Sequence, residues 1–146
     1  MDPEDVFQVG QWLWFDKDTC FGRYPHFGMI LGIDKESETI GLAINASSKL
    51  ENIEKYAKYN NIDTTRTHVK LKPNDSRGGY RFGKETIFDC NRPKIISYEN
   101  VSRWHSAGRI KIAEYNIDVD KDLLRELKLG VWESPVVEQK YKNMMI

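Results

Sequence analysis

The residues best suited to chemistry lie in short polar stretches between apolar runs. One such stretch, Asn74–Lys84, reads Asn-Asp-Ser-Arg-Gly-Gly-Tyr-Arg-Phe-Gly-Lys, so arginines alternate with aromatic residues and glycines. Guanidinium groups pair with phosphates, and aromatic rings stack on unpaired bases. The stretch favours contact with single-stranded nucleic acid, against the alternative of a hairpin loop whose aromatics fold back on the core. The candidate contacts are Arg77, Tyr80, Arg81, Phe82 and Lys84.

Two further groups fit the chemistry of phosphates. A histidine such as His26 could transfer a proton, since an unperturbed imidazole titrates near neutrality, although a lone histidine is more often structural or simply exposed. Ser47, Ser48 and Lys49 follow an apolar run and could donate hydrogen bonds to an anionic oxygen. The more ordinary interpretation of these serines is that one of them caps the next helix, and both roles can coexist.

A third polar run, Phe88–Lys94, lies between two apolar strands. Taken alone it carries little functional weight, and a family resemblance is what makes Asp89 and Arg92 candidate catalytic residues and Asn91 a candidate RNA contact. A turn would explain Asn91 and the following proline without any chemistry. Arg23 completes the set of candidate RNA-binding residues.

The charge of the chain is balanced overall but uneven along its length. The 146 residues carry 22 Lys+Arg and 22 Asp+Glu, yet the segment 66–111 holds eleven basic and four acidic residues, a local balance of +7. Such asymmetry is typical of polyanion binding. Pairing of the basic segment with acidic surfaces elsewhere is an equally good explanation.

Composition restricts the class of protein. A length of 146 residues with 40% apolar residues indicates one globular domain. The apolar runs are too short to span a bilayer, and the acidic start has no features of a secretory signal, so we expect a cytoplasmic protein. Cys20 and Cys90 have no metal-ligand spacing, and nucleotide-binding glycine motifs are absent from the sequence. We expect no metal and no cofactor.

The elements that must position these residues are mostly short strands. Alternating or aromatic-rich runs bounded by turn residues predict about seven of them, and residues 34–38 form the turn of a hairpin. The predicted strands are 11–15, 28–33, 39–45, 68–71, 86–88, 94–97 and 109–113.

Helices are expected at three places. Helical spacing of apolar residues predicts a surface helix over 50–60 and a second helix over 118–129, with Asp120 as its N-cap and Gly130 just beyond its end. Ser134-Pro135 would begin a last helix through Tyr141. Many short strands with a C-terminal helix indicate a mainly β fold with added α, in the form of a strongly bent sheet or small barrel.

In chain order, these segments resemble the PemK/MazF family, which includes the Kid toxin. The match is best at Thr86–Ser97, which is similar to the Kid-type pattern Val-Val-Arg-Cys-Asp-Gln-Pro-Arg-Thr-Ile-Asp. Other matching segments are Val9–Asp16, similar to a Gly-(Asp/Glu)-hydrophobic-Trp strand; Pro25–Leu31, with His26 in place of an arginine; Ala43–Ser48; and Gly108-Arg-Ile followed by a short helix.

The resemblance covers roughly residues 8–129 and implies a single SH3-like barrel domain, with 50–67 as a helical insertion and 131–146 as a C-terminal extension. It further implies a toxin of a toxin-antitoxin system that cleaves single-stranded RNA without metal. Its partners would be that RNA, a protein or RNA antitoxin, and a second copy of the chain. The aromatics of Gly10–Phe15 and the C-terminal helix are the expected dimer interface.

The chain departs from the family at the catalytic pair. Asp89 stands where Kid-type toxins have a catalytic arginine, and Asn91 where they have an aspartate. His26 would then carry the proton, Arg92 and Lys49 would stabilise the phosphate, and Asp89 is a reserve base. Two alternatives remain open: a binding module for RNA or protein that has lost catalysis, and a poison of DNA gyrase related to CcdB that acts through residues 132–146.

Overall fold

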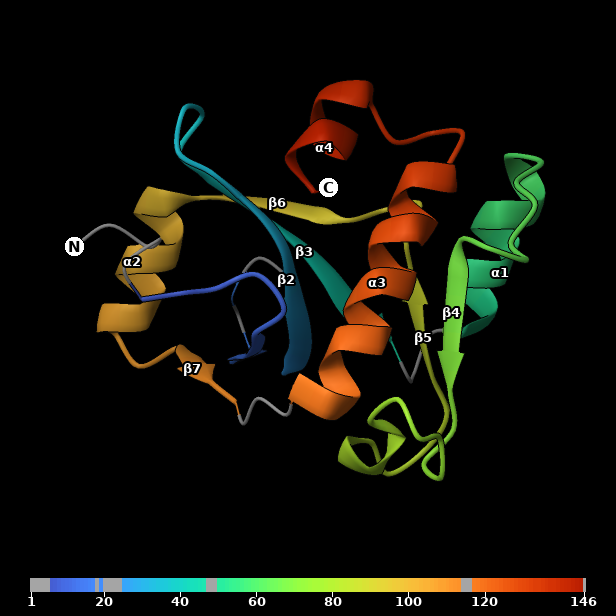
Figure 1. The fold of residues 1–146 in the computed structure, drawn as a ribbon, viewed down its shortest axis with the longest axis horizontal. Helices are drawn as coiled ribbons and strands as arrows, with labels where there is room; N and C mark the ends of the chain where they lie inside the picture. The colour runs from blue at the N-terminus through green and yellow to red at the C-terminus, as the bar shows by residue number, and fades with distance from the viewer. Residues whose placement is uncertain (1–5, 18, 20–24, 47–49, 114–116, 146) are drawn as a thin grey trace.

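The computed structural model describes residues 6–17, 19, 25–46, 50–113 and 117–145. It is a mainly antiparallel sheet with helices on its faces and ends (Figure 1). The strands are paired in the order β4-β5-β3-β2-β1-β7, and β6 lies beside the first half of β3. Their bounds are β1 Trp12–Phe15, β2 His26–Asp34, β3 Thr39–Ala46, β4 His68–Leu71, β5 Thr86–Asp89, β6 Lys94–Ser97 and β7 Ile110–Ile112.

The central strands are buried on both faces, which explains their nearly unbroken apolar sequence. Successive side chains of a strand point to opposite faces, so β1 and β2 divide their residues between two cores. Trp12, Met29 and Leu31 belong to one cluster together with helix residues such as Leu127. The second cluster lies between the central sheet, β6, β7 and a helix, and contains Leu13, Phe15, Ile30, Ile40, Leu42, Ile96, Val101 and Ile110.

Four helices are described. α1 (Leu50–Tyr59) packs beside β5, α2 (Tyr98–Ser106) contacts β6 and β7, and α3 (Ile117–Glu133) crosses β2 and β4 (Figure 1). α4 (Gln139–Met144) lies against β2, and a short 3-10 turn, η2 (Gly79–Arg81), follows β4. None of the described helices has the length and apolar character needed to cross a membrane.

The strand predictions are confirmed to within about two residues, and so are the hairpin and α1. The ends of the C-terminal helices were predicted wrongly. α3 begins before Asp120 and continues past Gly130 to Glu133, so neither residue caps it. α4 begins at Gln139, with Glu138 rather than Ser134 at its N-cap position. Helix α2 was not predicted, although the Ser97 side chain accepts a hydrogen bond from Asn100 N in the ordinary manner of an N-cap.

The C-terminal residues are part of the core. Met145 is 1% exposed and belongs to the cluster that contains Trp12. The sheet admits this segment because Gly32 and Gly41 carry no side chain: a Cβ on Gly32 would lie 2.2 Å from Met144 O, and one on Gly41 would lie 2.8 Å from Met145 Cε. The segment expected to extend from the fold therefore covers one face of its sheet.

Part of the expected dimer interface is enclosed by its own chain. Trp12, Leu13 and Phe15 are each 0% exposed. Strand β1 is paired on both edges, with β2 and with β7, and these three side chains lie inside the two cores. Trp14 is half-buried and Leu129 of α3 is 52% exposed, so the dimer interface stays a prediction.

Candidate functional site

Four of the residues proposed from the sequence line one groove of about 440 Å³, which we call the aromatic groove. His26 lies at the first position of β2, and Arg81, Phe82 and Lys84 come from η2 and the loop after it. The complete lining is Trp14, Pro25, His26, Phe27, Arg81, Phe82, Gly83 and Lys84.

The sheet register sets one wall of the aromatic groove. Trp14 of β1 is opposite Phe27 of β2, and the next pair is Phe15 and His26. Because opposite residues of an antiparallel pair point to the same face, Trp14 and Phe27 present neighbouring rings to the groove. On its other edge Trp14 is opposite Lys111, whose ammonium lies 5.3 Å from the indole centroid.

An ion pair buried beneath the groove holds the loop side in place. Arg81 makes a bidentate contact with Asp120 of α3, at 2.6 and 2.9 Å, and the two side chains are 10% and 0% exposed. Asp120 Oδ1 also accepts a hydrogen bond from Trp12 Nε1 at 3.1 Å. Strand β1, η2 and α3 therefore meet at one carboxylate. The charge of Arg81 is largely neutralised by this contact, and its guanidinium positions the loop.

Phe82 and Tyr80 have different surroundings. Phe82 is 7% exposed and contacts the rings of Trp12, Phe27 and Phe88, so it is a core residue that borders the groove. Tyr80 is 60% exposed, and its ring lies 5.1 Å from the Arg81 guanidinium. Tyr80 is thus the member of the loop that has an accessible face for stacking.

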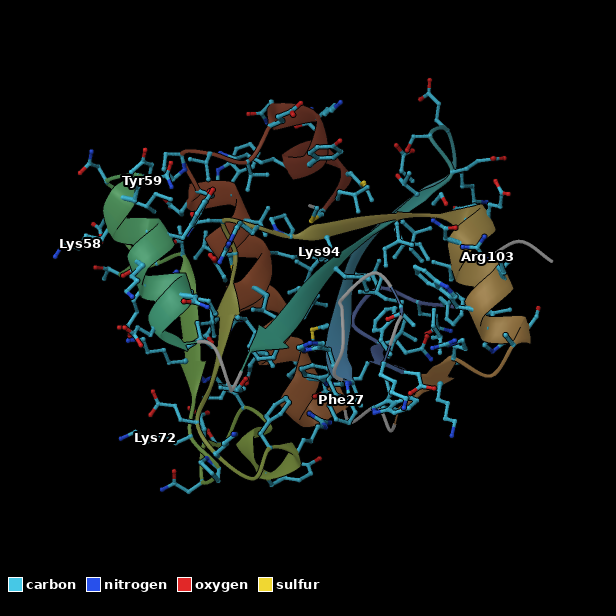
Figure 2. The ribbon with its side chains drawn as sticks, turned by 180° about the vertical axis from the view of Figure 1, so that it is seen from behind. Phe27, Lys58, Tyr59, Lys72, Lys94 and Arg103 are labelled. Carbon is cyan, nitrogen blue, oxygen red and sulfur yellow. The ribbon has the colours of Figure 1, made fainter. Side chains whose placement is uncertain are left out.

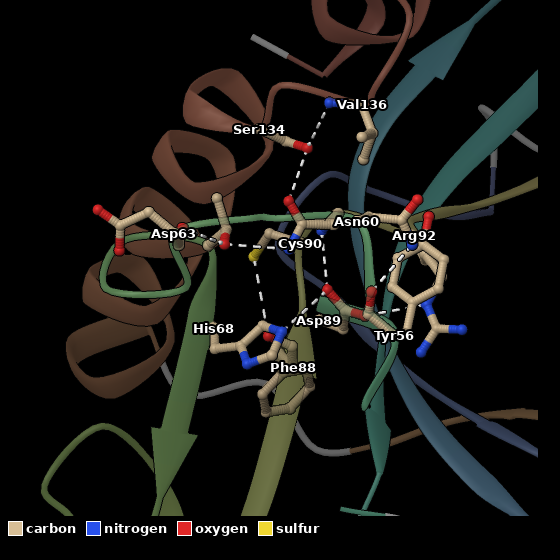
Figure 3. A network of polar contacts seen from close by, with 12 residues as sticks. Tyr56, Asn60, Asp63, His68, Phe88, Asp89, Cys90, Arg92, Ser134 and Val136 are labelled. Atoms are coloured by element: carbon tan, nitrogen blue, oxygen red, sulfur yellow. Dashed lines mark hydrogen bonds and ion pairs between the residues drawn. The ribbon is translucent and has the colours of Figure 1, made fainter. Parts of the chain in front are cut away.

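Asp89 and Arg92 belong to a separate polar network (Figure 3). Asp89 Oδ2 accepts from Arg92 Nε at 2.9 Å, and its Oδ1 lies 3.4 Å from Nε2 of His68. Burial would raise the pKa of the Asp89 carboxyl, but His68, Arg92 and the backbone N–H of Asn91 together hold that pKa below its ordinary value. Arg92 also stacks over Tyr56 of α1, 4.1 Å from the ring centroid. The carboxylate is fully engaged within the protein.

The side chain of Asn91 is likewise hydrogen-bonded within the protein. It is 4% exposed, donates from Nδ2 to Thr67 at 3.0 Å and accepts from Ser134 at 2.7 Å. Its neighbour Cys90 packs against Gly130, where an added Cβ would lie 2.6 Å from the sulfur. Burial, and to a lesser extent Asp89, raise the pKa of the Cys90 thiol, so the thiolate does not form at neutral pH.

Much of the basic segment is paired with carboxylates. Arg77 contacts Asp75 at 2.7 Å and also Glu126 of α3, which together raise the pKa of its guanidinium. Arg66 contacts Glu133, at the end of the same helix, at 3.2 Å. Acidic residues of α3 thus neutralise part of the +7 segment.

A second cavity, of about 550 Å³, lies beside the network, and we call it the His68 pocket. It is lined by Thr64, Thr65, Arg66, His68, Val69, Lys70, Arg77, Glu126 and Leu129. The two linings share no residue. Within the described part of the chain, no group of three His, Cys, Asp or Glu side chains is arranged to hold a metal ion.

The structure therefore divides the proposed site residues. His26, Arg81, Phe82 and Lys84 meet at the aromatic groove, and Tyr80 adjoins Arg81. The polar network and the His68 pocket hold Arg77, Asp89, Asn91 and Arg92. The remaining candidates, Arg23, Ser47, Ser48 and Lys49, lie outside the described residues.

Sequence reasoning missed two residues, Trp14 and His68. The Trp14 signal was present, since a tryptophan two positions after buried Trp12 in a paired strand must share its face. His68 gave no local signal, because its partner Asp89 lies on the neighbouring strand.

Comparison with protein-family models and with curated proteins finds no match for this chain.

Proposed function

We propose that this protein is the toxin of a toxin-antitoxin system, a metal-independent endoribonuclease of the PemK/MazF type that holds single-stranded RNA in the aromatic groove. The observation that carries the proposal is the combination in one groove of a histidine, aromatic rings and a lysine: His26, Trp14, Phe27 and Lys84. The order of resembling segments along the chain adds to it.

The aromatic groove has the two features that single-stranded nucleic acids require. Trp14 in the groove, and the exposed Tyr80 beside Arg81 of its lining, offer stacking faces that accept any base. The exposed Lys84 in the groove and Lys111 above Trp14 supply positive charge for the phosphates. An extended RNA strand would lie across the ends of β1 and β2, with its backbone along the lysines.

Cleavage in this proposal needs a proton carrier and a stabiliser of negative charge. His26 accepts the 2′-hydroxyl proton as that oxygen forms a bond to the adjacent phosphorus. The bond from phosphorus to the 5′-oxygen breaks, and the imidazolium returns the proton to that oxygen. Lys84 stabilises the negative charge that develops on the phosphoryl oxygens. The products are a 2′,3′-cyclic phosphate and a 5′-hydroxyl.

The finer architecture belongs to the same proposal. We propose an SH3-like barrel, supported by the enclosed second core, whose residues come from β1, β2, β3, β6, β7 and α2. A protein or RNA antitoxin and a second copy of the chain are the proposed partners. Poisoning of DNA gyrase through residues 132–146 stays a prediction: Met145 of that segment is buried, whereas Trp132 and Val136 are exposed.

One observation favours a second function, RNA binding without cleavage. At the positions where the family has its catalytic pair, half-buried Asp89 contacts His68, and buried Asn91 is hydrogen-bonded to Thr67 and Ser134. A chain that lost catalysis would keep the aromatic residues and lysines of the groove. It would bind RNA without cleaving it.

The deciding experiment is incubation of the purified protein with a long single-stranded RNA in EDTA, comparing wild type with His26→Gln. We expect specific cleavage that falls about 10²–10⁴-fold in the variant, as is typical for loss of a general acid–base group. His105→Gln on α2 is the matched control and should retain activity. RNA binding by both proteins with no cleavage by either would instead establish the binding module.

Failure of the wild-type protein both to bind and to cleave RNA would overturn both functions. Arrest of cell growth on expression, relieved by His26→Gln, would be the expected cellular counterpart of cleavage.

A further inference from the structure

The imidazole of His68 is buried, oriented and incompletely satisfied. Its side chain is 2% exposed, and Nε2 lies 3.4 Å from Asp89 Oδ1 without forming a well-shaped hydrogen bond. With Nε2 against Asp89, the other ring nitrogen, Nδ1, is left for a different partner. Within the described residues no group hydrogen-bonds Nδ1, and the residue lines the His68 pocket. A buried polar side chain in this state calls for an explanation beyond packing.

The other charged groups of the His68 pocket favour an anion. The lining contains Arg66, Lys70 and Arg77 against a single carboxylate, Glu126. Arg77 is paired with Glu126 and Asp75, and Arg66 is paired with Glu133. Among the described contacts, no ion pair involves the exposed Lys70. Lys70 is therefore the cation best able to bind a ligand.

The pocket differs from a nucleic-acid groove in one respect: none of its lining residues is Phe, Tyr or Trp. A base entering it would find no ring to stack on, so single-stranded RNA would bind it weakly. Its apolar wall consists of Val69 and Leu129, which suit a sugar or an aliphatic group. Its volume of about 550 Å³ lies within the range of small-molecule sites.

From these observations we infer that the His68 pocket binds a small phosphorylated molecule, with the ring of His68 between Asp89 and the phosphate and Lys70 as the second contact. Asp89 acts here as a positioning residue, which fixes the plane of the imidazole. The inference does not rest on RNA cleavage, because the aromatic groove has an entirely different lining.

The test is an NMR titration of the whole protein that follows the side-chain nitrogens of its three histidines. The probes are inorganic phosphate and adenosine 5′-monophosphate, each compared with sodium chloride at equal ionic strength. We expect both phosphates to shift the His68 signals saturably and to leave those of His105 unchanged. Lys70→Ala should weaken phosphate binding at least about tenfold, the usual consequence of losing a charged hydrogen bond.

Lys72→Ala is the matched control, since this exposed lysine lies two residues further along and does not line the pocket. It should bind phosphate like the wild type, and so should His26→Gln. The inference is overturned if sodium chloride reproduces the shifts, if no saturation occurs, or if Lys70→Ala and Lys72→Ala behave alike. Displacement of phosphate by an RNA oligonucleotide without terminal phosphates would also overturn it, by making the pocket part of the RNA path.

Discussion

The aromatic groove and the His68 pocket each hold a histidine and at least one lysine, but their walls differ. In the groove, half-buried His26 lies at a strand end beside Trp14 and Phe27. In the pocket, His68 is almost fully buried, lies against a carboxylate and has no aromatic neighbour in the lining. The first combination suits an extended chain of stacked bases, and the second suits one compact anion. The residues around each histidine, more than the histidine itself, therefore indicate which kind of ligand the site would bind.

The two regions also differ in how much of their charge is used internally. Beneath the groove, Arg81 is paired with fully buried Asp120. Beside the pocket, Arg77 is paired with partly exposed carboxylates, and its own side chain is 28% exposed. Arg77 and Arg81 belong to the same loop but should contribute differently to the stability of the fold. Substituting each arginine in turn measures the two contributions separately.

Arg81→Ala should have the largest effect on stability. It leaves the buried Asp120 without its bidentate partner, and removing one member of a buried ion pair costs about 3–5 kcal/mol. Arg77→Ala is the matched control and should cost less, because its partners Asp75 and Glu126 are partly exposed to solvent. Urea unfolding of both variants measures the difference. Equal losses would show that the groove is not held by the buried pair.

Asp89→Asn should lower the free energy of unfolding by about 1–3 kcal/mol at neutral pH, since it weakens the contacts to His68 and Arg92. The native pKa of Asp89 lies below the unfolded value of about 3.9, so the native state binds fewer protons than the unfolded state. The stabilisation is therefore complete above about pH 5 and disappears as the pH falls through the native pKa.

Urea unfolding between pH 3 and pH 7 tests the pH dependence. The gap between wild type and Asp89→Asn should narrow on acidification. Asp122→Asn is the control, because this carboxylate on α3 is 49% exposed and pairs with exposed Arg125, away from the contacts of Asp89, and it should change stability little. A gap that stays constant to pH 3 would exclude a role for the Asp89 charge.

Gly130→Ala tests how tightly the pocket side is packed. The new methyl group would lie 2.6 Å from Cys90 Sγ and 2.9 Å from its Cβ. Overpacking costs about 1–3 kcal/mol, offset by about 1 kcal/mol of improved helix propensity in α3, which leaves a net loss of up to about 2 kcal/mol. At Gly83 in the groove loop nothing lies within 4 Å, so Gly83→Ala should shift the melting temperature little.

Lys84→Ala should give the smallest effect, visible in the salt dependence of RNA binding. If Lys84 contacts one phosphate of a single strand, its loss reduces the slope of log K against log salt by about 0.7. Lys58→Ala on α1 is the control. Figure 2 shows Lys58 on the outer side of that helix, well away from Phe27 of the aromatic groove. Identical slopes for the two variants would remove Lys84 from the RNA path.

The strands were predictable from the sequence because their signal is local. Runs such as Gly28–Ile33 and Thr39–Asn45 are apolar, and the polar turn between them marks a hairpin. The helix ends were harder to predict, because distant partners decide them. Asp120 has the residue type of an N-cap, yet a hydrogen bond from Trp12, 108 positions away, holds it within α3. Ser97 is the exception: it is a local N-cap signal for helix α2, and the helix could have been predicted from it.

The site was predictable in its residue types and not in its grouping. The loop arginines were recognised as candidate phosphate ligands, but their pairing with Asp120 and Glu126 depends on how α3 crosses the sheet. For Asp89 and Asn91, the sequence leaves a catalytic or RNA-binding role and a purely structural turn as alternatives. Their buried partners, His68 and Thr67, come from strand and loop residues more than twenty positions away. Only the assembled fold shows such neighbours.

The carboxylate of Asp120 also bears on how fast the protein can fold. It joins β1 near one end of the chain to α3 near the other, and β1 additionally pairs with β7 across almost a hundred residues. Folds dominated by such distant contacts close large loops before they gain stability, and typically need milliseconds to seconds. The wall and the loop of the aromatic groove meet at Asp120 and in the ring contacts of Phe82 with Trp12 and Phe27, all of them between distant parts of the chain. A newly made chain would therefore acquire the groove late, as one of its last steps toward the native state.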